Sequence, residues 1–143
     1  EGILFLGPSG AGKTTIVKDL QQMGASVLAN EMTSLWYHED GNWRLSGVPF
    51  ERLQPFVGSE TDAVTHLGRI FLLRRSKGKQ RVHCLERADS AKTMLNNMVW
   101  CNATGQSMSR SMDSVMKLVD SQPVEELNYT RDVNWLIKML ERD

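Results

Sequence analysis

The sequence is poor in cysteine and has no long apolar run. Its 143 residues contain two cysteines, Cys84 and Cys101, without the paired spacing of a zinc site. Both stand in apolar surroundings, so we expect buried free thiols in a reducing cytoplasm. The longest apolar stretches, such as Gly2–Leu6 and Ile70–Leu73, are far too short to cross a bilayer. The sequence therefore predicts no association with a membrane.

Net charge is also lacking, because 17 basic residues balance 17 acidic ones. This balance gives no general attraction to nucleic acid. One basic cluster, Arg74–Arg81, surrounds Gly78. We interpret it as a solvated hairpin turn, with an anion or partner contact as the alternative. No signal-peptide pattern opens the chain, so we expect a cytoplasmic protein, and a start on a strand also fits a piece of a longer protein.

The length and the 41% hydrophobic content fit one domain over residues 1–143. At the beginning of the chain, apolar periodicity predicts a short strand, a helix with a glycine stop, and a second strand. These elements are Gly2–Leu6, Lys13–Met23 ended by Gly24, and Ala25–Ala29. Together they predict a βαβ unit with a right-handed crossover.

The remaining chain predicts a mixture of strands and helices. Asp40-Gly41 between two strand-like runs is a hairpin signal, whereas residues 57–66 are polar and predict a loop. Helix caps are expected at Asp89 or Ser90 and at Asp132. The expected elements are strands Ser34–His38, Trp43–Ser46, Leu67–Leu73, Val82–Leu85 and Leu127–Tyr129, and helices to about Trp100, over Ser107–Val119 and over Val133–Leu140. Leu67–Leu73 and Val82–Leu85 are expected to pair around the basic turn, and the methionines at helical spacing (Met94, Met98, Met108, Met112, Met116) to pack in the core.

One motif carries specific chemistry. Residues Gly7-Pro8-Ser9-Gly10-Ala11-Gly12-Lys13-Thr14 match G-x-x-x-x-G-K-[ST] at every position. The glycines allow backbone N–H groups to surround phosphates, Lys13 supplies a positive charge, and the Thr14 hydroxyl can ligate Mg²⁺. Because the loop also opens a helix, whose N-terminus favours an anion, we predict that Gly7–Thr15 binds ATP or ADP with Mg²⁺.

Most proteins with this phosphate-binding loop also have an acidic residue, later in the chain, that helps to hold the metal. The apolar strand at residues 69–75 ends in arginines and offers no ligand, and a guanine-reading N-K-x-D motif is absent. These absences argue against GTPases, transporter ATPases and helicases. Asn30-Glu31 follows the predicted second strand and would face the phosphates. Glu31 could therefore hold Mg²⁺ or its water, with a plain loop acid as the alternative.

The chain resembles the HPr kinase/phosphorylase superfamily, whose P-loop core is shared with the phosphoenolpyruvate carboxykinases. The resemblance lies in Gly7–Thr15, in Val27–Glu31 so soon after the loop, in Pro49-Phe50, in Ile70–Leu73 and in the tail with Leu127–Tyr129. It is nearest to the HPr-kinase-like serine kinases. It implies an α/β fold with a P-loop βαβ core, a mixed sheet and flanking helices, with Mg-ATP as ligand. The implied reaction is phosphoryl transfer to a serine of a protein or to a small molecule.

In that family two adjacent acids follow the second strand, one activating the acceptor hydroxyl and one holding metal. They correspond to Asn30 and Glu31. Glu31 keeps an acid, but an amide at Asn30 cannot take a proton at neutral pH. The implied catalytic set is Lys13, Asn30 and Glu31, with Thr14 and Glu31 at the metal. Alternatively, Glu31 is the base and Thr14 carries the metal alone.

Three functions remain open from the sequence. The first is an ATP-dependent, HPr-kinase-like phosphotransferase with an unidentified protein or small-molecule acceptor. The second is a nucleotide-binding module with little catalysis, acting as a switch or assembly partner. The third is a small-metabolite kinase, whose arginine-rich lid would be residues 74–81. Arg44, Arg52 and Arg69 could each approach a phosphate, His38 is a weaker acid/base candidate, and association of identical chains stays open.

Overall fold

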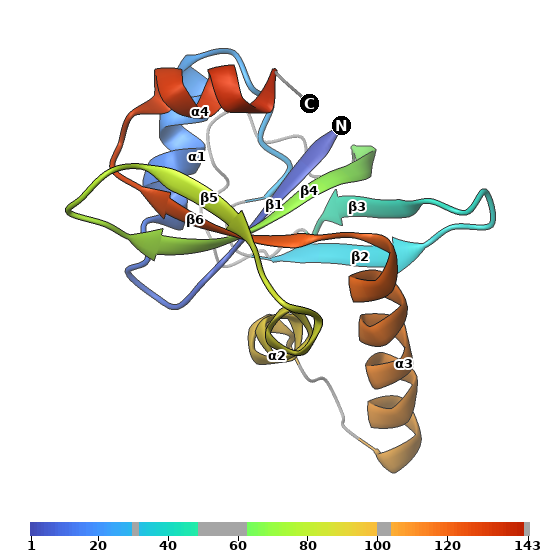
Figure 1. The fold of residues 1–143 in the computed structure, drawn as a ribbon. Coiled ribbons are helices and arrows are strands. Elements are labelled where there is room, and N and C mark those ends of the chain that lie inside the picture. Colours follow the sequence, from blue (N-terminus) through green and yellow to red (C-terminus); the bar gives the residue numbers. More distant parts are fainter. Residues whose placement is uncertain (30–31, 49–62, 100–103, 142–143) are drawn as a thin grey trace.

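The computed structural model describes residues 1–29, 32–48, 63–99 and 104–141, which fold into a mixed α/β structure with six strands and four helices (Figure 1). The strands are β1 (Gly2–Leu6), β2 (Thr33–Tyr37), β3 (Trp43–Gly47), β4 (Val64–Arg75), β5 (Arg81–Cys84) and β6 (Val124–Tyr129). The helices are α1 (Lys13–Gln22), α2 (Arg87–Asn97), α3 (Gly105–Ser121) and α4 (Val133–Leu140). None of the helices in these ranges is long and apolar enough to cross a membrane.

The long strand β4 organises the sheet. It pairs in parallel with β1 and with β6, and its first residues pair antiparallel with β3. The sheet runs in the order β2-β3-β4-β6-β5, with β1 paired to β4 outside that path. The β2–β3 hairpin closes with Tyr37 opposite Trp43, and β5 lies antiparallel to β6. The hairpin predicted from Asp40-Gly41 is confirmed.

Helices cover both faces of the sheet, so the core has two parts (Figure 1). Successive residues of β4 alternate between them, because strand side chains point to opposite faces. Phe71 and Leu73 pack with Ile16 of α1 and Leu136 of α4. The other part lies against α2 and α3 and contains, among others, Ile70, Leu72, Met94, Val115 and Leu118. Burial on both faces explains why β4 reads as a continuous apolar run.

Local capping agrees with the sequence at the end of α1 and at the start of α4. Gly24 adopts φ +97, and the N–H groups of Gly24 and Ala25 bond back to Gln21 and Leu20, which terminates α1. The Asp132 carboxylate accepts from the N–H of Trp135 at 3.0 Å and begins α4. The start of α2 was misplaced, because its N-cap is Glu86 rather than Asp89 or Ser90.

The predicted strand at Ala25–Ala29 is wrong. Only Val27 makes a single bridge there, and the parallel neighbour of β1 is β4 rather than this segment. The βαβ unit predicted within the first part of the chain is therefore not formed. Val27 is nonetheless 6% exposed. Its side chain is buried by packing, and a buried apolar segment has the same sequence pattern whether or not it forms a strand.

The predicted pairing of Leu67–Leu73 with Val82–Leu85 is also wrong, because β6 lies between β4 and β5. Gly78 and the basic cluster mark a turn, but a turn signal does not determine which strand becomes the neighbour. β6 buries Val124 and Leu127 and takes the inner place, whereas β5 is largely exposed and takes the edge. In addition β4 begins at Val64, within the predicted loop 57–66, of which 57–62 lie outside the described residues.

Several side chains expected in the core are exposed. Cys84 is an exposed free thiol on the edge strand β5, so it is not a buried one. Met94 lies in the core, but Met108 and Met112 are 48% and 45% exposed on α3. Helical spacing predicted their common stripe correctly. The spacing could not indicate that only part of α3 packs against the rest of the protein.

Candidate functional site

The loop that joins β1 to α1 has the backbone geometry that its glycines permit. Gly7, Gly10 and Gly12 have φ of +147, +78 and +103, conformations that residues with a Cβ rarely adopt. A Cβ at Gly7 would also stand 3.2 Å from the carbonyl oxygen of Leu73. The loop therefore requires glycine for conformation at three positions and for close packing at the first.

The loop leads directly into the N-terminus of α1. Gly12 is the N-cap and provides no side chain to accept from the first-turn N–H groups, and no acidic residue lies in that turn. The partial positive charge of the helix end is thus not compensated by the helix itself. Thr14 is exposed in this turn and Thr15 is partly buried. Such an end attracts an anion.

Lys13 brings a full positive charge into the curve of the loop. Its Nζ donates to the carbonyl oxygens of Gly7 at 2.5 Å and Pro8 at 2.9 Å. A turn within the loop is closed by the N–H of Ala11, which donates to the Pro8 carbonyl at 3.1 Å. Pro8, Ser9 and Gly10 are exposed, so the outer part of the loop is open to a ligand.

A side chain from α2 supports the loop from the other side. The N–H of the buried Gly7 donates to Oδ1 of Asn97 at 3.0 Å. The amide of Asn97 is oriented in turn, since its Nδ2 donates to the carbonyl of Thr93 at 2.8 Å. Gly7 is therefore held through its N–H by α2 and through its carbonyl by Lys13. Sequence reasoning missed Asn97, and no local signal marks it.

A groove of about 700 Å³ adjoins the loop. Gly7, Pro8 and Lys13 border it, and strands β1, β2 and β3 and helices α2 and α3 supply the walls. Its lining is mainly apolar, with Leu4, Leu35, Trp43, Met98 and Val115 among the residues. Lys13 is the only charged side chain among the described residues that line it. The arrangement offers an apolar surface next to one concentrated positive charge.

Part of the predicted site lies outside the described residues. Asn30, Glu31 and Arg52 lie outside the described residues, so their predicted roles stay predictions. Within the described ranges no group of three or more His, Cys, Asp or Glu is placed to hold a metal. The contiguous segment Gly7–Thr15 is thus the part of the predicted site that the structure describes.

Arg44 and Arg69 are both engaged away from the loop. Arg69 makes two hydrogen bonds to Glu125, at 2.7 and 2.9 Å, and is paired in register with Ile3 at the start of β1. The loop lies at the other end of β1. Neither Arg69 nor Arg44, which bonds to Asp40, can serve the loop while it keeps these partners.

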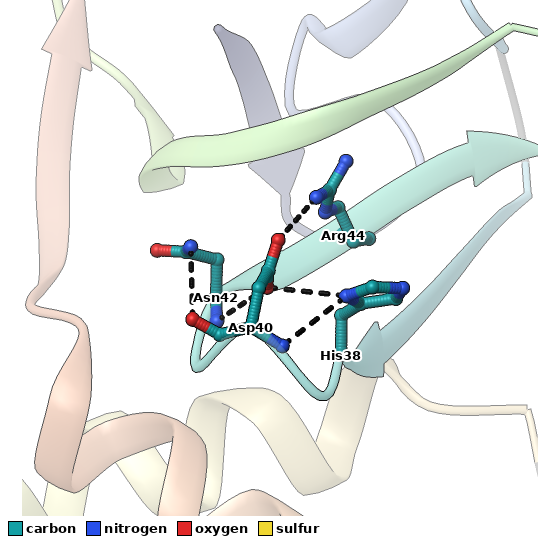
Figure 2. A network of polar contacts seen from close by, with 4 residues as sticks. All are labelled: His38, Asp40, Asn42 and Arg44. Carbon is teal, nitrogen blue, oxygen red and sulfur yellow. Dashed lines mark hydrogen bonds and ion pairs between the residues drawn. The ribbon is translucent and has the colours of Figure 1, made fainter.

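His38 belongs to the β2–β3 turn rather than to the loop. Figure 2 shows that Arg44, His38 and Asn42 all surround Asp40. Asp40 Oδ1 accepts from the N–H of Asn42 at 3.0 Å, and Nδ1 of His38 lies 3.2 Å from it. The hydrogen bond from Arg44 holds the pKa of the Asp40 carboxyl well below its usual range. The network therefore stabilises a turn. The other two histidines, His66 and His83, are exposed on strands β4 and β5.

Comparison with known proteins found no matching family model, no curated relative and no similar solved structure. The resemblance to the HPr kinase superfamily therefore depends on the sequence motifs alone. Function has to be inferred from the chemistry of the loop and its surroundings.

Asn97→Ala should loosen the loop. The change leaves the buried N–H of Gly7 without its acceptor, which costs about 1–3 kcal/mol. Urea unfolding should show this loss, and hydrogen exchange at the Gly7 amide should accelerate. Asn96→Ala is the matched control, because it gains the same helix propensity at an exposed neighbouring position. Equal stabilities of the two variants would contradict a supporting role for Asn97.

Asp40→Asn should destabilise the protein in a pH-dependent way. A carboxyl whose folded pKa is lowered stabilises the fold above its unfolded pKa, and this contribution is lost as the pH falls. The difference between wild type and variant should be complete at pH 7. It should shrink below about pH 4, the ordinary pKa of aspartate. Thermal unfolding between pH 7 and pH 2 measures it, and a difference that stays constant over this range would be the contrary result.

Proposed function

We propose that this protein binds a nucleoside triphosphate at Gly7–Thr14 and is an HPr-kinase-like phosphotransferase that uses ATP to phosphorylate a hydroxyl group. One observation supports this most: a loop with three glycines at positive φ carries the Lys13 ammonium at the open N-terminus of α1. Backbone N–H groups, a helix end and one lysine are what a chain of phosphates requires.

Each part of the loop has a role in this proposal. The first-turn N–H groups bind phosphate oxygens, and Lys13 exchanges its bonds to Gly7 and Pro8 for bonds to the terminal phosphates. The exposed Thr14 hydroxyl is a hard oxygen ligand that fits Mg²⁺. The metal would neutralise charge on the phosphates. Asn97 keeps Gly7 in place while Lys13 changes partners.

The acceptor would enter from the apolar groove beside Lys13. An apolar wall excludes water, which strengthens the interaction between Lys13 and a phosphate and limits hydrolysis. Phosphoryl transfer depends mainly on positioning and on stabilisation of charge, and these residues supply both. The third function, a small-metabolite kinase, gains no comparable support from the geometry.

A second candidate function is nucleotide binding without efficient catalysis. The amide at Asn30 favours it, because that position is an acid in the family that the chain resembles, and an amide cannot accept the proton of the acceptor. On this alternative the loop would still bind ATP and ADP. The protein would then act as a switch or an assembly partner.

Lys13→Ala should weaken ATP binding by about 10- to 100-fold, the loss expected for charge-assisted hydrogen bonds. Calorimetric titration with ATP and ADP, with and without Mg²⁺, measures this change. Lys18→Ala is the control, since it removes an exposed lysine from the same helix. If wild type binds no nucleotide, or if both variants bind like wild type, the loop is not the nucleotide site.

Asn30→Asp distinguishes the two candidate functions. If Asn30 stands on the reaction path, restoring the acid should raise phosphoryl transfer by about 10²-fold, the usual contribution of a general base. Transfer from labelled ATP to a serine-containing peptide mixture measures the rate, and Asn42→Asp in the β2–β3 turn is the control. A large gain would indicate a site that has lost its base, as the binding module requires, whereas unchanged turnover with intact ATP binding would argue against Asn30 lying on the reaction path.

A further inference from the structure

Three parallel strands bring their carboxyl ends to one edge of the sheet. Leu6, the last residue of β1, pairs with Leu72 of β4, and β4 then continues to Arg75 beside Tyr129 of β6. The glycine-rich loop follows Leu6 directly. β4 therefore extends three residues beyond its last pair with β1, and the carbonyl oxygen of the first of them, Leu73, would stand 3.2 Å from a Cβ at Gly7.

The alternation of side chains assigns a face to each residue at this strand end. Leu73 lies on the α1 face, where its Cδ2 is 3.8 Å from the position of a Cβ at Gly12, the N-cap of α1. Arg75 belongs to the same face by its register. Tyr129 opposite it faces the same way, since its hydroxyl donates to Asp19 of α1 at 2.9 Å. Arg74 belongs to the other face and is bonded to Glu126 at 3.2 Å.

The charge of Arg75 has no counterpart among the described residues. Arg75 is exposed, and no hydrogen bond or ion pair involves it there. The acid of α1 on this face, Asp19, already accepts from Tyr129 and lies 3.7 Å from Arg131. Arg75 follows Leu73, which contacts the loop, by two residues on the same face of β4, so its charge adds to those of Lys13 and of the N-terminus of α1 at this end of the sheet. Positive charge concentrated in this way attracts an anion with more than one charge.

We infer that Arg75 binds the terminal phosphate of the nucleoside triphosphate held by the glycine-rich loop, reaching it from β4. This inference rests on the proposed function of the loop. Arg75 stands at the end of the strand next to β1, and its guanidinium offers a planar set of donors that matches phosphate oxygens. It is a binding residue that makes the site prefer a triphosphate to a diphosphate. Residues 74–81 therefore contribute one specific cation rather than a solvated turn alone.

Arg75→Gln should weaken binding of ATP and of inorganic triphosphate by about tenfold, with a smaller effect on ADP and pyrophosphate. Calorimetry with these four ligands measures the preference for the third phosphate. Arg74→Gln is the matched control, because it removes the same charge from the adjacent residue on the opposite face. Circular dichroism melting verifies that both variants fold, as expected for exposed positions.

The possible outcomes separate this inference from the proposed function. Wild type that binds neither ATP nor triphosphate overturns both. If wild type binds and Lys13→Ala does not, but Arg75→Gln behaves like wild type, the loop is the site and the role of Arg75 is wrong. Equal losses in Arg74→Gln and Arg75→Gln, or equal losses for ATP and ADP, also overturn it. A selective loss for the triphosphates in Arg75→Gln alone supports it.

Discussion

The parallel pairing of β1 with β4 is the constraint on which the rest of the structure depends. β4 has 12 residues, and along its length it pairs first with β3, then with β1 and finally with β6. Because it is buried on both faces, it separates the core into one part under α1 and α4 and another under α2 and α3. The same strand places its carboxyl end beside the glycine-rich loop. The register between β1 and β4 therefore determines both the arrangement of the sheet and the position of the candidate site.

The loop itself is held by few interactions, each from a different part of the chain. Asn97 of α2 accepts from the N–H of Gly7, Lys13 of α1 donates to its carbonyl, and Leu73 of β4 packs against it. A loop that needs three glycines at positive φ pays conformational entropy for its shape. Support from a helix and a strand that are already packed offsets this cost, which is a physical reason for the loop to keep its shape before a ligand arrives.

The sequence predicted what depends on neighbouring residues and failed where distant residues decide. The glycine-rich loop, the end of α1 at Gly24 and the β2–β3 hairpin were predicted correctly, because backbone conformation and turn chemistry are local. The segment Ala25–Ala29 was wrong, since an apolar run shows burial but does not show whether a strand partner exists. The neighbours of β5 were wrong for a similar reason: pairing of distant strands is a tertiary choice.

By itself, the sequence determined the α/β class and the place and backbone conformation of the glycine-rich loop, because both follow from local pattern and residue type. It proposed Arg44 and Arg69 as cations for the loop, but their bonds to Asp40 and Glu125 show that they are engaged elsewhere. Only the tertiary structure placed Asn97 against Gly7 and Arg75 on the α1 face. The physical reason is that a contact between distant residues depends on strand register and helix packing. The sequence around each of the two residues carries no local pattern that signals such a contact.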